Sequence, residues 1–107
     1  MIYNRSNGKV ILQNPAATGI VLQSNGDCEY VYLALNPRSK LEKHKLPIPV
    51  TFFVISGSGE LCLDGTLYSA TKCDLINAGA NAEREWVNAS DSTLELLVVK
   101  HLTQELA

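Results

Sequence analysis

Apolar and polar side chains alternate with a period of two along most of this chain. Successive side chains on a strand point to opposite faces, so this alternation predicts β-strands. Gly, Asn, Asp and Pro interrupt the pattern about every eight to twelve residues, which is the spacing of turns in all-β proteins. The pattern predicts ten strands, over residues 9–13, 19–23, 28–35, 40–46, 50–56, 60–63, 66–70, 74–77, 83–88 and 93–101.

The connections between these segments are short and contain residues suited to tight turns. Asp64-Gly65 is the clearest hairpin signal, because both residues accept the positive φ that a two-residue turn requires. Many short strands joined in this way predict an all-β sandwich or barrel, here as one domain over residues 1–107. A helical turn is expected only at the end, in residues 103–107.

The strand at residues 50–56 is apolar on both of its faces. One face carries Val50, Phe52 and Val54, and the opposite face includes Phe53 and Ile55. Such a strand is expected to be covered on both sides. The barrel interior would cover one face, and a second sheet or a subunit partner would cover the other, so we expect a homodimer.

Composition narrows the classes of function. The chain has 107 residues, 46% of them hydrophobic and 19% charged, with a net charge of −2, which is typical of a soluble globular protein. No global positive charge favours nucleic acid or an anionic membrane, and the chain shows no signal peptide or membrane span, so we expect a cytoplasmic protein. The three cysteines form no close pair, which argues against a disulfide framework or a thiolate zinc site.

Two segments carry residues at a characteristic spacing. They read His44-x-Leu46-(x3)-Val50-(x6)-Gly57 and Cys73-Asp74-(x9)-Arg84-(x3)-Asn88. These spacings resemble the two motifs of the cupin superfamily, and the resemblance covers about residues 28–100. It implies an antiparallel double-stranded β-helix, also called a jelly-roll barrel. Cupins have many unrelated functions, so the resemblance alone does not identify the activity.

In that family three His and one Glu bind a divalent metal. The corresponding positions here are His44, Leu46, Val50 and Arg84. Leu and Val offer no lone pair, and a guanidinium stays positive and repels a cation. We therefore expect no metal at this site and no cofactor.

The altered site is better suited to an organic ligand. Arg84 has the planar fork that binds a carboxylate or phosphate, and His44 could add a second polar contact. Apolar walls are expected from four further residues, namely Leu46, Val50, Phe52 and Trp86. The main prediction is a metal-free barrel that binds a small, anionic organic ligand in its interior.

Other interpretations of the same residues stay open. Arg84 could form a surface salt bridge to Glu83 or Glu85, His44 could be an ordinary exposed histidine, and Phe52 and Trp86 could be core residues. One alternative function is a metal-independent isomerase or epimerase, with His44 as the general base and an inward tyrosine as the acid. The candidate acids are Tyr30, Tyr32 and Tyr68. A second alternative is a structural or partner-binding barrel filled by its own side chains.

Overall fold

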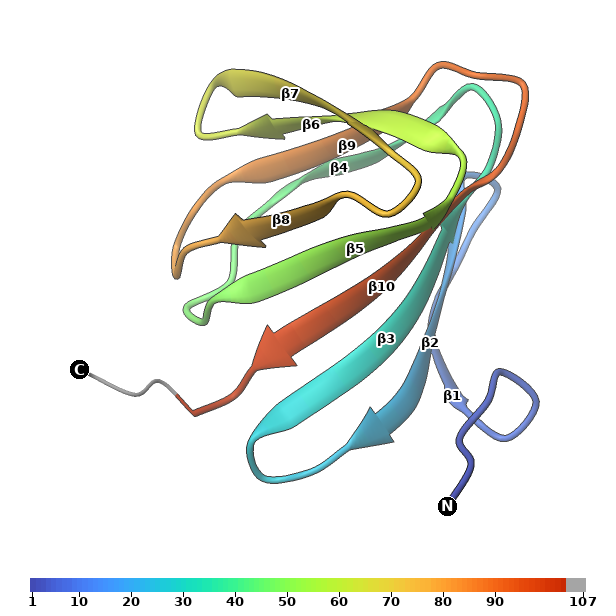
Figure 1. Ribbon diagram of the computed structural model, residues 1–107, viewed down its shortest axis with the longest axis vertical. Helices are drawn as coiled ribbons and strands as arrows, with labels where there is room; N and C mark the ends of the chain where they lie inside the picture. The colour runs from blue at the N-terminus through green and yellow to red at the C-terminus, as the bar shows by residue number, and fades with distance from the viewer. Residues whose placement is uncertain (104–107) are drawn as a thin grey trace.

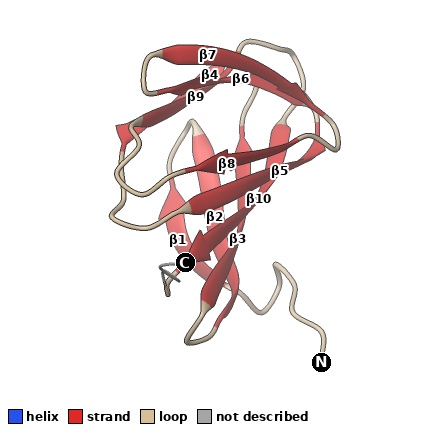
Figure 2. Cartoon of the chain, turned by 60° about the vertical axis from the view of Figure 1, so that its left-hand side comes forward, coloured by secondary structure: helices blue, strands red, loops and turns tan. Residues whose placement is uncertain are grey.

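The computed structural model describes residues 1–103, which form ten β-strands and no helix (Figures 1 and 2). The strands are β1 (Lys9–Gln13), β2 (Ala17–Ser24), β3 (Cys28–Leu35), β4 (Ser39–His44), β5 (Val50–Ser56), β6 (Ser58–Leu63), β7 (Thr66–Thr71), β8 (Leu75–Ala78), β9 (Arg84–Asn88) and β10 (Leu94–His101). All ten predicted strands are confirmed, and the helical turn expected at residues 103–107 extends outside the described residues. No helix that could cross a membrane occurs in the described part of the chain.

The strands form two antiparallel sheets that pack face to face (Figure 1). The larger sheet has the order β1-β2-β3-β10-β5-β8, and the smaller sheet has the order β4-β9-β6-β7. From β3 onward most consecutive strands, such as β5 and β6, lie in different sheets, so the chain passes repeatedly between the two layers. This is the jelly-roll architecture that the strand pattern and the motif spacing predicted.

Side chains from the two inner faces form the core. In β5 the inward side chains of Val50, Phe52 and Val54 are buried, and Thr51 and Phe53 between them are half-buried, as the alternation predicted. The largest fully buried side chain is Trp86 of β9, whose ring meets Phe52 edge to face at a centroid distance of 5.5 Å. Aromatic pairs prefer this geometry, and the contact joins the two sheets.

Two turns use residues with positive φ. The hairpin between β6 and β7 is made by Asp64 and Gly65, with φ of 48° and 84°, as predicted. Gly57 connects β5 to β6 with φ of 84°, and a Cβ there would lie 2.5 Å from the backbone oxygen of Thr93. Only glycine fits such a place, so this motif residue allows the chain to change sheets.

Asn88 at the end of β9 holds the loops at one end of the barrel. Its side chain is completely buried, and its Nδ2 lies within 3.1 Å of three carbonyl oxygens, those of Leu35, Asn36 and Ser92. Its Oδ1 accepts hydrogen bonds from the backbone and hydroxyl of Ser90. The asparagine of the second motif therefore has a structural role in this chain, independent of any ligand.

Candidate functional site

A cavity of about 670 Å³ opens between the β1–β2 hairpin, the inner face of the larger sheet, and strands β4 and β9. Pockets that hold small organic molecules usually have volumes of this order. Most of the wall is apolar, with Leu12, Val31, Leu33, Leu41 and Val98 among its residues. Part of the barrel interior is thus open, while the core side chains fill the rest.

Four of the six predicted site residues meet at this cavity, namely His44, Phe52, Arg84 and Trp86. His44 and Arg84 are register partners on neighbouring strands β4 and β9, and Arg84 and Trp86 alternate on β9. Alternate residues share a face, so the sheet itself brings these side chains together. That they bind a ligand stays a prediction.

The other two predicted wall residues, Leu46 and Val50, do not line the cavity. Val50 is 1% exposed and packs within the core. Leu46 follows the end of β4 in a loop, where its carbonyl accepts a hydrogen bond from the backbone of Asn81 and its side chain packs against the core. Both expectations came from the family's metal-ligand positions, and in this chain those two positions belong to the core.

Arg84 is the most unusual residue of the cavity. Its side chain is 3% exposed, and no described residue forms a hydrogen bond or ion pair with its Nη1. Its guanidinium carbon lies 5.8 Å from the centroid of the Phe52 ring. Burial lowers the pKa of Arg84 from its ordinary value, yet an arginine remains protonated in proteins. A full positive charge is therefore held in a largely apolar wall, where it contacts the Phe52 ring but no acidic side chain among residues 1–103.

The salt bridge considered as an alternative for Arg84 does not form. Glu85 instead lies near Lys40, with 3.9 Å between the Lys40 Nζ and a carboxylate oxygen. The indole Nε1 of Trp86 is a second buried donor without a hydrogen-bond partner among the described residues. Buried donors are usually satisfied by protein groups or by ordered water. Arg84 and Trp86, at alternate positions of β9, thus each have one buried donor without a partner among the described residues.

His44 lies at the mouth of the cavity, where its side chain is exposed. Its Nδ1 is 3.3 Å from the backbone oxygen of Glu42, and no carboxylate among the described residues orients the ring. The same mouth carries Lys40, Lys43 and Lys100. His44 is therefore an exposed histidine, as the alternative interpretation expects, and it also lines the cavity, as the main prediction expects.

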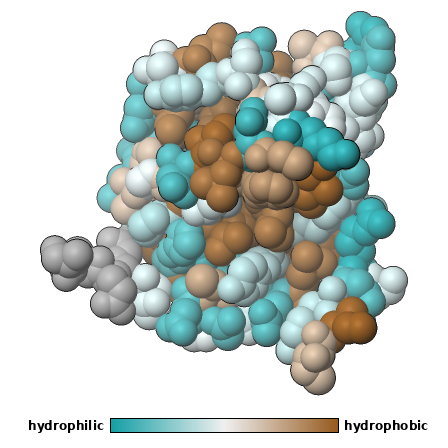
Figure 3. Space-filling view, in the orientation of Figure 1, coloured by the Kyte–Doolittle hydropathy of each residue, from teal (hydrophilic) through white to brown (hydrophobic). Residues whose placement is uncertain are grey.

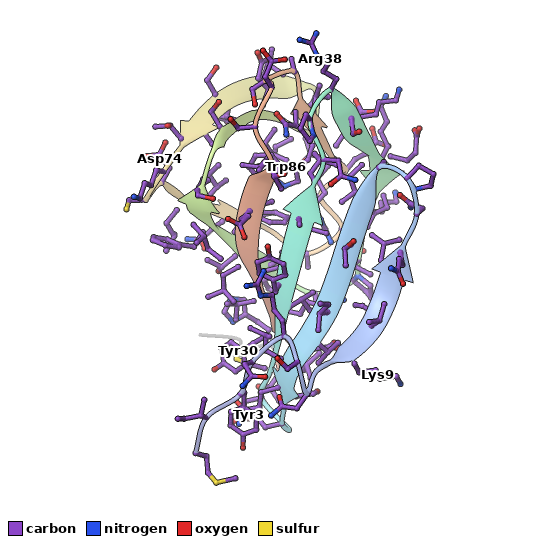
Figure 4. The ribbon with its side chains drawn as sticks, turned by 90° about the vertical axis from the view of Figure 1, so that its right-hand side faces the viewer. Tyr3, Lys9, Tyr30, Arg38, Asp74 and Trp86 are labelled. Atoms are coloured by element: carbon purple, nitrogen blue, oxygen red, sulfur yellow. The ribbon has the colours of Figure 1, made fainter. Side chains whose placement is uncertain are left out.

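None of the three candidate acids for an epimerase, Tyr30, Tyr32 and Tyr68, lines the cavity. Tyr32 lies on the outer face of the larger sheet, where its hydroxyl donates a hydrogen bond to Glu95. Tyr68 is 46% exposed on β7. In Figure 4, Tyr30 lies in the lower half of the molecule and Trp86 in the upper half. The cavity thus lacks the tyrosine that general-acid catalysis beside His44 would need.

The residues present do not fit the metal that the fold family implies. The positively charged Arg84 occupies one of the four ligand positions, and Leu46 and Val50 occupy two more without a donor atom. Among residues 1–103, no three His, Cys, Asp or Glu side chains converge on one point. A cation placed beside the buried guanidinium would be repelled rather than bound.

Comparisons with known proteins support the fold. No protein-family model matches the chain, and no curated protein matches it. An RmlC-like cupin from Shewanella frigidimarina superposes with a TM-score of 0.79 at 13% identity, covering 94% of this chain and 88% of that one. The polyketide cyclase RemF from Streptomyces resistomycificus gives 0.81 at 18% identity, covering 96% and 80%.

AerE from Microcystis aeruginosa gives a TM-score of 0.84 at 27% identity over 94% of this chain, which spans only 48% of that protein. Together these likenesses define the class of the domain. The chain has the cupin fold, and the resemblance in its motif spacing is confirmed at the level of the fold. These structural neighbours differ in function, so the fold does not determine the activity, which has to be inferred from the residues of the site.

Proposed function

We propose that this cupin-fold barrel binds a small, anionic organic ligand in its interior cavity without a metal. The observation that carries the proposal is the guanidinium of Arg84, which is 3% exposed in the wall of a cavity of about 670 Å³ and has no acidic partner among the described residues. An unsatisfied buried charge is costly to the fold, so its presence is best explained by an anion that completes it.

The charges around the cavity mouth favour the same class of ligand. Lys40, Lys43, His44 and Lys100 lie at the mouth, and Glu42 is the acidic side chain among the lining residues. A cleft with mostly positive charges at its mouth attracts anions and raises their rate of entry, especially at low salt. The apolar wall then supports binding of the rest of the molecule.

A thermal-shift screen of carboxylates and sugar phosphates tests the proposal on wild type and Arg84→Met. A ligand at a hundred times its dissociation constant adds about 2.7 kcal/mol to the stability of the wild type. Arg84→Met should show no shift with that ligand, whereas Arg38→Met, which removes an exposed arginine paired with Asp91, should keep it. A shift that survives in Arg84→Met would exclude the proposed contact.

Metal analysis tests the metal-free part of the proposal. Protein purified without chelator should contain well under one transition-metal ion per chain, because the cavity offers a guanidinium where a cation would sit. Near-stoichiometric iron, zinc, nickel or manganese would overturn this part.

We further infer that the chain forms a homodimer through the outer face of the larger sheet. An apolar row crosses five strands of this face, made of register neighbours Ile20, Tyr32, Leu97, Phe53 and Leu75. Leu75 is 59% exposed, and hydrophobic surface gathers in the middle of the view in the region of β5, β8 and β10 (Figure 3). Contiguous apolar surface of this kind favours association.

The cytoplasmic location expected from the sequence stays a prediction.

A further inference from the structure

The charges that face the cavity set the charge of its ligand. At the mouth, Lys40 lies 3.9 Å from a carboxylate oxygen of Glu85, and Lys100 lies 3.9 Å from one of Glu29. These lysines already have acidic neighbours, and they are partly exposed, so water and salt screen them. Arg84 alone is both buried and without an acidic partner among the described residues. The interior therefore holds one uncompensated positive charge, which matches one negative charge on the ligand.

The donors around Arg84 favour a carboxylate over a phosphate. The guanidinium fork matches the planar carboxylate group, and a carboxylate carries a single charge. A phosphate monoester carries about −1.5 to −2 at pH 7, so it would bring excess negative charge into an apolar wall. The indole Nε1 of Trp86, two residues along the same strand, is a second orphan donor, and it is neutral. The guanidinium thus supplies the one positive charge that a carboxylate balances, and the indole adds no further charge.

The rest of the cavity sets the shape of the ligand. A carboxyl group occupies only a small part of about 670 Å³, and the wall beyond Arg84 is formed largely by aliphatic and aromatic side chains. Val31, Leu33, Phe52 and Val98 belong to this wall. Gly19 of β2 also lines the cavity, and a Cβ there would lie 3.2 Å from the Cβ of Leu12 in the hairpin, so the wall is closely packed at this point. Apolar volume is bound most favourably by apolar surface, at about 25 cal/mol for each Å² removed from water.

We propose that the natural ligand is a monocarboxylic acid whose body is apolar and at least as large as a six-membered ring. The carboxylate contacts the guanidinium of Arg84, and the apolar body lies against Phe52 and the aliphatic wall. This inference rests on the proposed function and narrows it from small anions in general to hydrophobic monocarboxylates.

Trp86 is the single tryptophan of the chain, so its fluorescence reports directly on the cavity wall. Full-length protein is titrated with four compounds, and calorimetric titration provides a second readout. Cyclohexanecarboxylate has both the charge and the body, cyclohexanemethanol has the body without charge, acetate has the charge without the body, and cyclohexyl phosphate has the body with a larger charge. Cyclohexanecarboxylate should bind at least about tenfold more tightly than each of the others.

The outcomes separate this inference from the proposed function. If cyclohexyl phosphate binds as tightly as the carboxylate, the ligand class is wrong while anion binding stands. If acetate binds as tightly, the apolar body is wrong while anion binding again stands. If the alcohol binds as tightly, both proposals fail, because the charge is then not recognised. If none of the four binds, the hydrophobic monocarboxylate is excluded, and the wider screen decides anion binding.

Two variants test the contact itself. Arg84→Met should lose at least about tenfold in affinity for cyclohexanecarboxylate and keep that for cyclohexanemethanol, so that the preference between the two is lost. Arg84→Lys keeps the charge but loses the planar fork, and it should bind the carboxylate with intermediate affinity. Equal affinity for the carboxylate in wild type and both variants would overturn the assignment.

Discussion

Replacing Arg84 with methionine is expected to stabilise the protein without ligand while it removes anion binding. The guanidinium is 3% exposed, its Nη1 has no partner among the described residues, and the surrounding wall includes Phe52 and Trp86. Methionine is of similar length, flexible and apolar, so it can fill this space without bringing a charge into it.

The magnitude follows from the cost of an unsatisfied buried group. A buried donor without a partner costs about 1 to 3 kcal/mol, and more when it is charged. Replacing buried ionic groups by apolar side chains of similar volume often stabilises a protein by about 1 to 4 kcal/mol. Because the guanidinium also lies over the ring of Phe52, which offsets part of this cost, we expect a gain of about 1 to 3 kcal/mol in the free energy of unfolding.

Urea unfolding at equilibrium measures this gain at a fixed protein concentration, with a calorimetric melting temperature as a second readout. About 1 kcal/mol corresponds to a shift of about 4 to 8 °C for a domain of this size. Arg38→Met is the matched control, because its side chain is 72% exposed and the substitution should change stability by no more than about 0.5 kcal/mol.

A fall of more than about 1 kcal/mol in the free energy of unfolding of Arg84→Met, with Arg38→Met unchanged, would contradict this expectation. It would mean that the guanidinium stabilises the unliganded barrel, so its burial would no longer favour an external anion.

Four further predictions concern the frame of the barrel and its outer face. Cys73 is exposed with φ of 73°, so Cys73→Gly should raise the free energy of unfolding by about 1 kcal/mol in urea, and a loss would contradict the strain. Asn88→Ala leaves buried carbonyls unpaired and should cost about 3 kcal/mol or more in the same assay; a cost below about 1 kcal/mol would contradict this role. The hydroxyl of Ser56 lowers the pKa of Glu95, so this carboxylate stabilises the fold above the unfolded pKa of about 4.3, and the stabilisation is lost as pH falls through the lowered folded pKa. Glu95→Gln should therefore be less stable than wild type at pH 7, and the difference should shrink as the pH is lowered below about 4.3; a difference independent of pH would exclude ionisation as its source. Light scattering should find dimers of wild type and monomers of Leu75→Lys at micromolar concentration, and monomeric wild type would overturn the dimer.

The strands could be predicted from the local sequence because apolar and polar side chains alternate within each of them. The predicted bounds of β1, β3 and β5 agree with the structure at both ends. The strand expected to end at residue 46 instead ends at His44, although the alternation continues to Leu46. There the carbonyl of Leu46 bonds to the backbone of Asn81, far along the chain, and a local pattern contains no information about such a contact.

The site was only partly predictable for a related reason. Alternation indicates that Val50 and Phe52 point inward on the same strand, but it does not tell which of them faces packed atoms and which faces an open space. Leu33 and Val98 were equally visible as inward residues of predicted strands, and nothing in their neighbours distinguished a cavity wall from a core. Arg84 could be singled out because it stands at a ligand position of the cupin motif and carries a positive charge where the family has a histidine.

The position of β10 also has a consequence for how the protein is made. This strand is the last of the described chain, yet it lies in the middle of the larger sheet and pairs with both β3 and β5. Until it leaves the ribosome, β3 and β5 each present an open edge that another chain could pair with. Completion of the larger sheet therefore waits until β10 has been synthesised, and folding dominated by such distant pairings is slow. A nascent or truncated chain that ends before Leu94 should be the most aggregation-prone form of this protein.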